Sequence, residues 1–284
     1  MRNHNFIRIV IIGVVLVLFE QFSGLNSVYG LSLMGPPRSL LQPEENSFGI
    51  ELGYSEMDLD SFGDVTETVA GLSTPDFSKY KIEKLKSIMP LVRFDTNIFE
   101  NWDLFLRVGA SDASGDLNEE QAGGASGHKF NDFDGNLGFS WGVGTRTTFY
   151  QQDNTTWGAI FQADWINPGD SDITDKTDAG FSGSAEISYW EVQVAIGPTV
   201  EFDNVRVYGG PFLHFVNGDL DISGTTTSTI PDTSTKVSHD IKEKSQLGGF
   251  LGAQWNLGNN NTLVTEAQFT GDAWGIGIGT TWKF

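Results

Sequence analysis

The sequence contains no cysteine among its 284 residues, which excludes disulfide bonds, thiolate metal sites and a cysteine nucleophile. Basic residues are also scarce: 17 lysines and arginines stand against 37 aspartates and glutamates, a net charge of −20. Because nucleic-acid binding needs a basic surface, this balance argues against a nucleic-acid partner. Only 9 prolines but 34 glycines are present, and this proportion favours a β-rich fold over a helical one.

The N-terminus has the features of a signal peptide. Arg2 and Arg8 precede an apolar run of eleven residues at 9–19, which is too short for a membrane-spanning helix of about 20 residues. Val28, Tyr29 and Gly30 then offer a cleavage site before Leu31. The sequence therefore predicts a signal peptide at 1–30, an N-terminal leader at 31–46, and one domain at 47–284.

Alternation of bulky and small residues dominates that domain. In the last twelve residues, Trp274, Ile276 and Ile278 share one face, whereas glycines occupy the other. Strict alternation predicts β-strands with two unlike faces. Such runs predict ten strands, near residues 48–54, 88–98, 102–110, 137–149, 157–165, 190–200, 205–215, 247–257, 263–269 and 273–284. Eight strands remain an alternative, because 205–215 contains Pro211 and 263–269 has a weaker pattern.

The expected connections alternate in length. Short turns contain residues such as Asp203 and Asn204, whereas long connections are expected at 61–80, 112–132, 166–182 and 217–243. Short turns at one end and long loops at the other are typical of a transmembrane antiparallel up-and-down β-barrel. An even number of strands places both termini at the short-turn end, which would be the periplasm.

A soluble barrel also has alternating strands, and the polarity of the two faces decides between the alternatives. The face opposite the aromatic residues is polar or bare, with charged residues, glutamines and glycines. A soluble barrel would have to place all large residues inside, where ten strands leave too little room. An apolar exterior and a polar interior instead suit a barrel in lipid. The tryptophans add an expected girdle at the membrane interfaces, formed by Trp102, Trp157, Trp165, Trp255, Trp274 and Trp282.

The final strand resembles the assembly signal of bacterial outer-membrane β-barrel proteins, with Phe284 at the terminus and Trp282 two positions before it. The resemblance implies insertion by the barrel-assembly machinery and closure of the last strand against the first. It also implies contact with outer-membrane lipid and lipopolysaccharide. This resemblance identifies a class, the small barrels of eight or ten strands, and no particular member.

The expected lumen carries charges of both signs. Basic and acidic residues of inward parity are predicted to form a pairing network: Glu51, Arg93, Asp95, Arg107, Arg146, Asp164, Glu191, Arg206 and Glu266. Asp103 and Lys283 share this parity. Since a buried unpaired charge is costly, we expect these pairs to occlude the lumen. The alternative is that several pairs lie at the rims and leave a narrow pore.

An enzymatic role rests on His214, the candidate catalytic residue. Its surroundings faintly resemble the His-x-Ser-Asn segment of outer-membrane lipid A deacylases, but Val216 replaces the serine nucleophile. Omptin-like proteases use aspartate and histidine at the extracellular rim, and the candidate partners here are Asp164, Asp219 and Asp221. His128 and His239 are expected to be solvated loop residues. The simpler interpretation is that His214 packs in the lumen.

The long loops are expected to be acidic and exposed. Asp170, Asp172 and Asp175 have a spacing like that of a calcium loop, but the glycine and glutamate of an EF-hand are missing. We expect a small outer-membrane barrel that is structural or binds an unidentified extracellular ligand, with no cofactor and no enzymatic activity. A narrow channel is the second alternative, and a hydrolase with a site at the rim is the third.

Overall fold

The computed structural model describes residues 31–62, 65–69, 72–76, 79–120, 126–176, 180–227 and 233–284. The predicted signal peptide lies outside these residues. Within them, ten strands form a closed antiparallel ring in the order β1, β4, β5, β8, β9, β11, β12, β14, β15 and β16. Their bounds are Asn46–Phe62, Lys79–Phe99, Trp102–Glu120, Gly138–Gln152, Thr155–Asn167, Phe181–Phe202, Val205–Thr226, Leu247–Gly258, Asn261–Phe269 and Ala273–Lys283.

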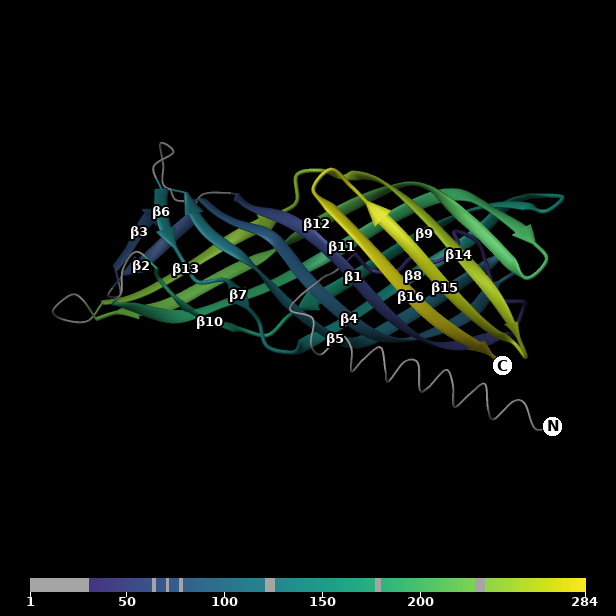
Figure 1. Cartoon of the computed structure of the whole chain (residues 1–284), viewed down its shortest axis with the longest axis horizontal. Coiled ribbons are helices and arrows are strands. Elements are labelled where there is room, and N and C mark those ends of the chain that lie inside the picture. The colour runs from purple at the N-terminus through teal and green to yellow at the C-terminus, as the bar shows by residue number, and fades with distance from the viewer. Residues whose placement is uncertain are drawn as a thin grey trace.

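This ring confirms the prediction of a ten-stranded barrel. Both uncertain stretches are strands, because the residues around Pro211 lie in β12 and those around Ala267 in β15. The ring closes where β1 pairs with β16, from Ser47 opposite Lys283 to Met57 opposite Ala273. The C-terminus and the short turns lie at one end of the barrel (Figure 1). No helix in the described part of the chain is long and apolar enough to cross a membrane.

The prediction of long loops is wrong over most of its extent. Strands β4, β11 and β12 continue for 21, 22 and 22 residues, far into the regions expected to be loops. Six shorter strands extend the barrel at the end away from the C-terminus and the short turns (Figure 1). They are β2 (Val65–Val69), β3 (Leu72–Asp76), β6 (Ser126–Lys129), β7 (Phe133–Asp134), β10 (Ser171–Thr174) and β13 (Thr233–Lys242).

Each long ring strand reverses its polarity part-way along its length. On β1, Phe48 and Ile50 face outward beside the buried Glu51, but farther along Met57 is buried and Asp58 is exposed. On β11, Trp190 faces outward and Glu191 inward, whereas the preceding Ile187 is buried and Glu186 is exposed. We call the part nearest the short turns the lower barrel, and the part beyond the reversal the upper barrel.

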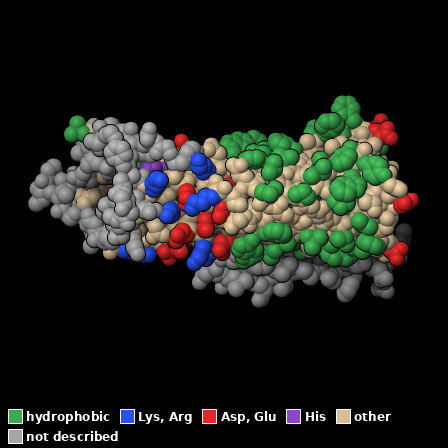
Figure 2. Space-filling view, turned by 90° about the horizontal axis from the view of Figure 1, so that it is seen from above, with side chains coloured by type: hydrophobic (Ala, Val, Ile, Leu, Met, Phe, Trp, Pro, Cys, Tyr) green, Lys and Arg blue, Asp and Glu red, His purple; other side chains and the backbone are tan. Residues whose placement is uncertain are grey.

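The lower barrel is apolar outside, as expected for contact with lipid. Figure 2 shows hydrophobic side chains covering this part, and charged side chains beginning where the apolar band ends. The upper barrel has the polarity of a soluble protein instead. Its interior is a continuous apolar core that includes Met57, Leu59, Ile82, Leu85, Leu117, Phe133, Ile173, Ile187, Leu220, Ile222 and Ile241.

Candidate functional site

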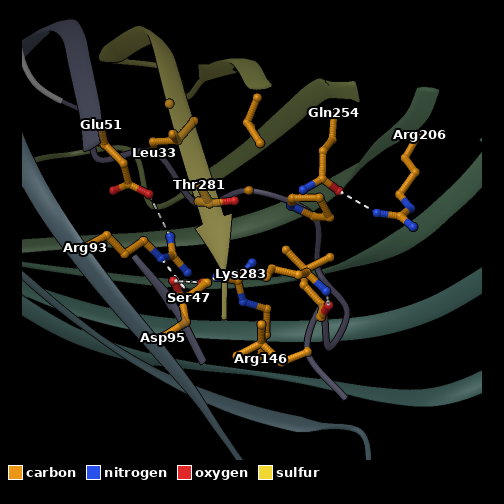
Figure 3. A pocket seen from close by; sticks show the side chains of 16 residues that line it. Leu33, Ser47, Glu51, Arg93, Asp95, Arg146, Arg206, Gln254, Thr281 and Lys283 are labelled. Atoms are coloured by element: carbon orange, nitrogen blue, oxygen red, sulfur yellow. Dashed lines mark hydrogen bonds and ion pairs between the residues drawn. The ribbon is translucent and has the colours of Figure 1, made fainter. Parts of the chain in front are cut away.

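Three arginines form the centre of the lower lumen. Arg93 donates to Glu51 and to Asp95, in each case over 2.9 Å. Arg146 reaches the same Asp95 at 2.6 Å. Arg107 pairs with Asp164 and lies 3.6 Å from Glu51. Figure 3 shows Glu51, Arg93 and Asp95 converging in the lumen.

These groups are removed from solvent, since no side chain of the cluster is more than 5% exposed. Arg93 and Arg107 lie directly opposite each other on β4 and β5. The Phe105 ring lies beside them, 3.8 Å from the Arg93 guanidinium carbon and 5.2 Å from that of Arg146. The carboxylates between the arginines therefore offset the repulsion of like charges, and the aromatic face contributes a further attraction.

The leader passes through the lower lumen, which the sequence did not indicate. Its backbone N–H groups donate to three carboxylates of the wall. The Ser32 N–H donates to Glu191 over 3.2 Å, and those of Met34 and Gly35 donate to Glu266 over 2.9 Å each. The Leu40 N–H and the Ser39 hydroxyl donate to Asp103 over 2.6 and 2.7 Å.

Wall residues also donate to carbonyl groups of the leader. Arg107 donates to the Leu33 carbonyl over 2.8 Å. Gln268 and Gln162 donate to the Ser32 carbonyl over 2.9 and 3.2 Å. These bonds satisfy buried polar groups that would otherwise be costly. Because they involve the backbone of the leader, they fix its path whatever its side chains are.

The bare face of β16 is explained by this path. A Cβ placed on Gly277 would lie 2.9 Å from the Leu33 side chain, and one on Gly275 would lie 2.9 Å from the Leu31 Cβ. Only glycine allows the leader to lie this close to the wall. The run of alternate glycines was thus the one sequence signal that could have revealed an internal segment.

Little space remains around the leader in the lower lumen. A cavity of about 30 Å³ is lined by residues that include Leu33, Glu51, Arg93, Arg146 and Lys283 (Figure 3). This volume holds one or two water molecules. Above it, Leu31 joins the apolar core of the upper barrel. The lumen is therefore filled by a lower layer, in which the charged cluster and the leader adjoin a smaller apolar cluster that includes Met34, Phe212 and Phe250, and then by the larger apolar core.

The remaining charged residues of the predicted network have other partners. Glu191 and Glu266 bind the leader backbone rather than an arginine. Arg206 lies near the short turns, where it pairs with Glu201 and donates to Gln254 over 3.2 Å. Arg206 thus lines the same small cavity as Arg93 and Arg146, but it pairs with Glu201 and not with the carboxylates of their cluster.

His214 lies inside the barrel and not at an open rim. It is fully buried, with its Nδ1 atom 2.7 Å from Glu243 and its Nε2 atom 3.3 Å from Glu191. None of its three candidate partners joins it: Asp164 pairs with Arg107, whereas Asp219 and Asp221 have outward parity on β12. His239, expected to be solvated, is also buried, with its ring 4.5 Å from that of Tyr80.

The other candidates also have defined places. Asp170 and Asp172 are exposed but Asp175 is buried. Groups of three or more histidine, cysteine or acidic side chains suited to a metal are absent from the described residues. Trp102, Trp157, Trp255 and Trp282 lie near the short turns, whereas Trp165 and Trp274 lie toward the upper edge of the apolar band. Phe284 exchanges backbone hydrogen bonds of 2.9 and 3.1 Å with Asn46, and the Trp282 ring lies 6.2 Å from Phe48.

Comparison with protein-family models and with curated proteins finds no match. Among solved structures, the chain is similar to the outer membrane protease OmpT from Escherichia coli. The TM-score is 0.53 at 8% identity, covering 87% of this chain and 99% of the other. It is also similar to OprG from Pseudomonas aeruginosa (TM-score 0.45, 9% identity, 86% and 97% coverage). The likeness to OmpT shows the fold: the chain is a β-barrel of the outer-membrane type.

Proposed function

We propose that this outer-membrane β-barrel is an integral protein of the bacterial outer membrane that conducts no solute and acts at the cell surface, as a structural or surface-interacting protein. The lower barrel spans the membrane in this proposal, and the upper barrel stands above the lipid. The short turns and both ends of the barrel domain then face the periplasm. Insertion proceeds through the barrel-assembly machinery, for which β16 supplies the recognised strand.

One observation carries the proposal: two different layers fill the lumen in series. The lower layer combines the arginine cluster with the leader and leaves a cavity of about 30 Å³. The upper layer is the apolar core, in which Ile187 and Leu220 have no exposed surface. A solute would have to pass both layers, and they differ in chemistry, so no single change in pH or charge opens them together.

The outside of the upper barrel supports an interaction role. Outward-facing carboxylates are numerous on β5, β7, β10, β11 and β12: Asp112, Asp116, Asp134, Asp172, Glu186, Asp219 and Asp221. An extracellular ligand would meet this acidic surface first, and long-range attraction would favour a cationic group. Lipopolysaccharide surrounds the barrel at the level where the apolar band ends.

Single-channel conductance of the refolded chain 31–284 in a planar bilayer tests the proposal. We expect no conductance from this chain, and none from a variant that starts at Gln42, because the upper core remains. Conductance should appear only when removal of the leader is combined with Met57→Ser, Ile187→Ser and Leu220→Ser. The same triple substitution with the leader retained is the matched control, and heat-modifiable gel mobility verifies folding of each variant.

Reproducible conductance steps from the unmodified chain would contradict the proposal and place the protein among narrow channels. Steps after removal of the leader alone would show that the upper core is permeable. In that case the leader would be the gate of a pore, and closure would depend on one layer only.

A further inference from the structure

The described lysines are unevenly distributed over the upper barrel. Lys79, Lys81, Lys84 and Lys86 lie on β4, and Lys242 and Lys244 lie at and just beyond the end of β13, which is separated from β4 by β1. The rest of the wall, from β5, which adjoins β4, through β7 and β10 to β12, has mainly carboxylates, with Lys176 paired to Asp132 at 3.4 Å. The upper barrel therefore has one region, on β4 and the end of β13, where lysines lie among carboxylates, whereas the rest of its wall is mainly acidic.

Lys84 occupies an irregular position in β4. The register of β4 shifts between Glu83 and Lys86, and Lys84 is the inserted residue, with a φ of 51°. The other non-glycine residues with positive φ in the described chain lie in turns or in the leader. This bulge is held by the Lys84 N–H, which donates to Asp58 over 2.7 Å. A left-handed lysine within a strand costs about 1 kcal/mol, and the bulge directs its side chain outward.

Lys84 and Lys86 lie directly above the apolar band. Two residues beyond Lys86, Ile88 faces outward in the lower barrel, followed by Pro90. Neither lysine side chain takes part in an ion pair with a described residue. Glu56 lies opposite Lys86 in the register. The Asp58 carboxylate accepts the hydrogen bond from the Lys84 N–H. Two ammonium groups are thus available at the height of a lipid headgroup.

An apolar groove begins immediately below them. It has a volume of about 330 Å³ and crosses the outer wall from β4 over β1 to β16. Its lining comprises Leu52, Gly53, Tyr54, Ile88, Pro90, Asp112, Leu137, Ile276, Gly277 and Ile278. Gly53 and Gly277 are opposite each other in the register and face the lumen, so only their backbone lines the groove, between the outward side chains of its other residues. This volume is in the range of small-molecule binding sites.

From these observations we propose a binding site for one phosphorylated, acylated lipid of the outer leaflet. An acyl chain lies in the groove, and the phosphate lies against the ammonium groups of Lys84 and Lys86, which donate charge-assisted hydrogen bonds. Asp112, at the β5 edge of the groove, repels the phosphate and confines it to the lysine side. This inference rests on the proposed membrane position of the lower barrel. It adds that the side formed by β4, β1 and β16 is the one that binds a lipid tightly.

Native mass spectrometry of the refolded chain 31–284 in detergent tests the site, with diphosphorylated lipid A as the probe. We expect one tightly bound lipid, and about 25-fold weaker binding after Lys84→Gln with Lys86→Gln, because each lysine near an anionic group contributes about a factor of five. Leu52→Trp fills the groove and should weaken binding while both lysines remain. The matched control is Lys176→Gln with Lys236→Gln, which removes the same charge elsewhere and should leave binding unchanged.

Three results would overturn the site. Equal binding of dephosphorylated lipid A would show that the lysines do not bind the phosphate. An equal loss of lipid binding in the control variant, Lys176→Gln with Lys236→Gln, would show that only the net charge of the protein matters. Displacement of the lipid by millimolar inorganic phosphate would indicate a phosphate site that does not bind an acyl chain. The conductance of the lysine variants stays at zero in every case, so failure of the lipid site and failure of the closed lumen are distinguished.

Discussion

Strands β1, β5, β11 and β12 run through both the lower and the upper barrel with the same inward parity, yet the chemistry of the two parts is reversed. On β12, His214 and Leu220 both point inward, whereas Leu213 and Asp219 both point outward. The register decides which side chains face the lumen. The medium outside decides what those side chains must be, because lipid requires an apolar exterior and water permits a polar one.

The two interiors achieve stability by different means. The lower lumen depends on directed bonds, such as those of Arg107 to Asp164 and to the Leu33 carbonyl. The upper core depends on burial of apolar area, which requires shape but no specific partner. Substitutions that keep the volume but change the polarity of an inward side chain should therefore destabilise both parts, by loss of directed bonds in the lower lumen and by burial of a polar group in the upper core.

The largest effect is expected when a charge enters the apolar core. Leu220→Asp buries an unpaired carboxylate where the side chain has no exposed surface, and we expect a loss of about 3–5 kcal/mol in the free energy of unfolding. The outward Val194→Lys, in the apolar band that the proposal places in lipid, should cost roughly 2–4 kcal/mol. Denaturant unfolding in lipid vesicles, followed by tryptophan fluorescence, measures both losses.

Asp219→Leu is the control for Leu220→Asp, since it exchanges the same two residue types one position away. Because Asp219 is exposed on the outer face, this variant should unfold within about 0.5 kcal/mol of the unmodified chain. Equal losses at positions 219 and 220 would show that the interior of the upper barrel is hydrated and that the contrast between the two parts is wrong.

A smaller effect is expected from a broken ion pair in the lower lumen. Arg107→Met retains bulk but leaves Asp164 without its buried cation, which should cost about 3 kcal/mol. Lys244→Met removes the exposed pair with Asp60, which spans 2.7 Å with the lysine side chain 60% exposed; we expect a loss below about 1 kcal/mol. Equilibrium unfolding at 0.05 M and 0.5 M salt compares the two, and only the Lys244 pair should weaken with salt. A salt-sensitive Arg107 pair would contradict the closed lumen.

The sequence predicted the lower barrel well, because its outward residues are apolar at every second position. In the upper barrel the outward positions are polar, mostly Asp, Glu, Lys, Ser and Thr, and inward residues such as Ile173 and Leu220 alternate with them. Such a pattern has the composition of a polar loop, and only closure of the ring buries its apolar residues. Alternation of period two is present in both parts, but the polar outward residues of the upper part led to the prediction of long loops there.

The lumen was predicted less completely, for a different reason. Inward parity identified the arginines and carboxylates, but parity gives no information on height along the barrel, so Arg206 was grouped with Arg107. The leader has no periodicity, and Pro36 and Pro37 exclude it from a strand. Its position depends on wall residues far away in sequence, such as Glu266, which no local pattern connects with Met34.

The smallest effect concerns the acidic outside of the upper barrel. Asp219 lies directly opposite Asp240, and partial burial, followed by the charges of Asp240 and Asp221, raises the pKa of the Asp219 carboxyl above its ordinary value. A raised carboxyl pKa means that the folded state binds a proton more readily than the unfolded state, so stability falls as the pH rises through this range. Asp219→Asn should therefore stabilise the protein by roughly 0.3 kcal/mol at neutral pH.

That gain should shrink as the pH falls below the raised pKa of Asp219, and vanish below the ordinary aspartate value of about 4. Denaturant midpoints between pH 4 and pH 8 measure the difference, and Asp172→Asn on β10 is the control for loss of one exposed carboxylate. A gain that grows at low pH would reverse the sign and show that Asp219 is stabilised by a cation. The acidic side of the upper barrel would then already hold a positively charged partner, whereas a gain confined to high pH leaves its charges available for one.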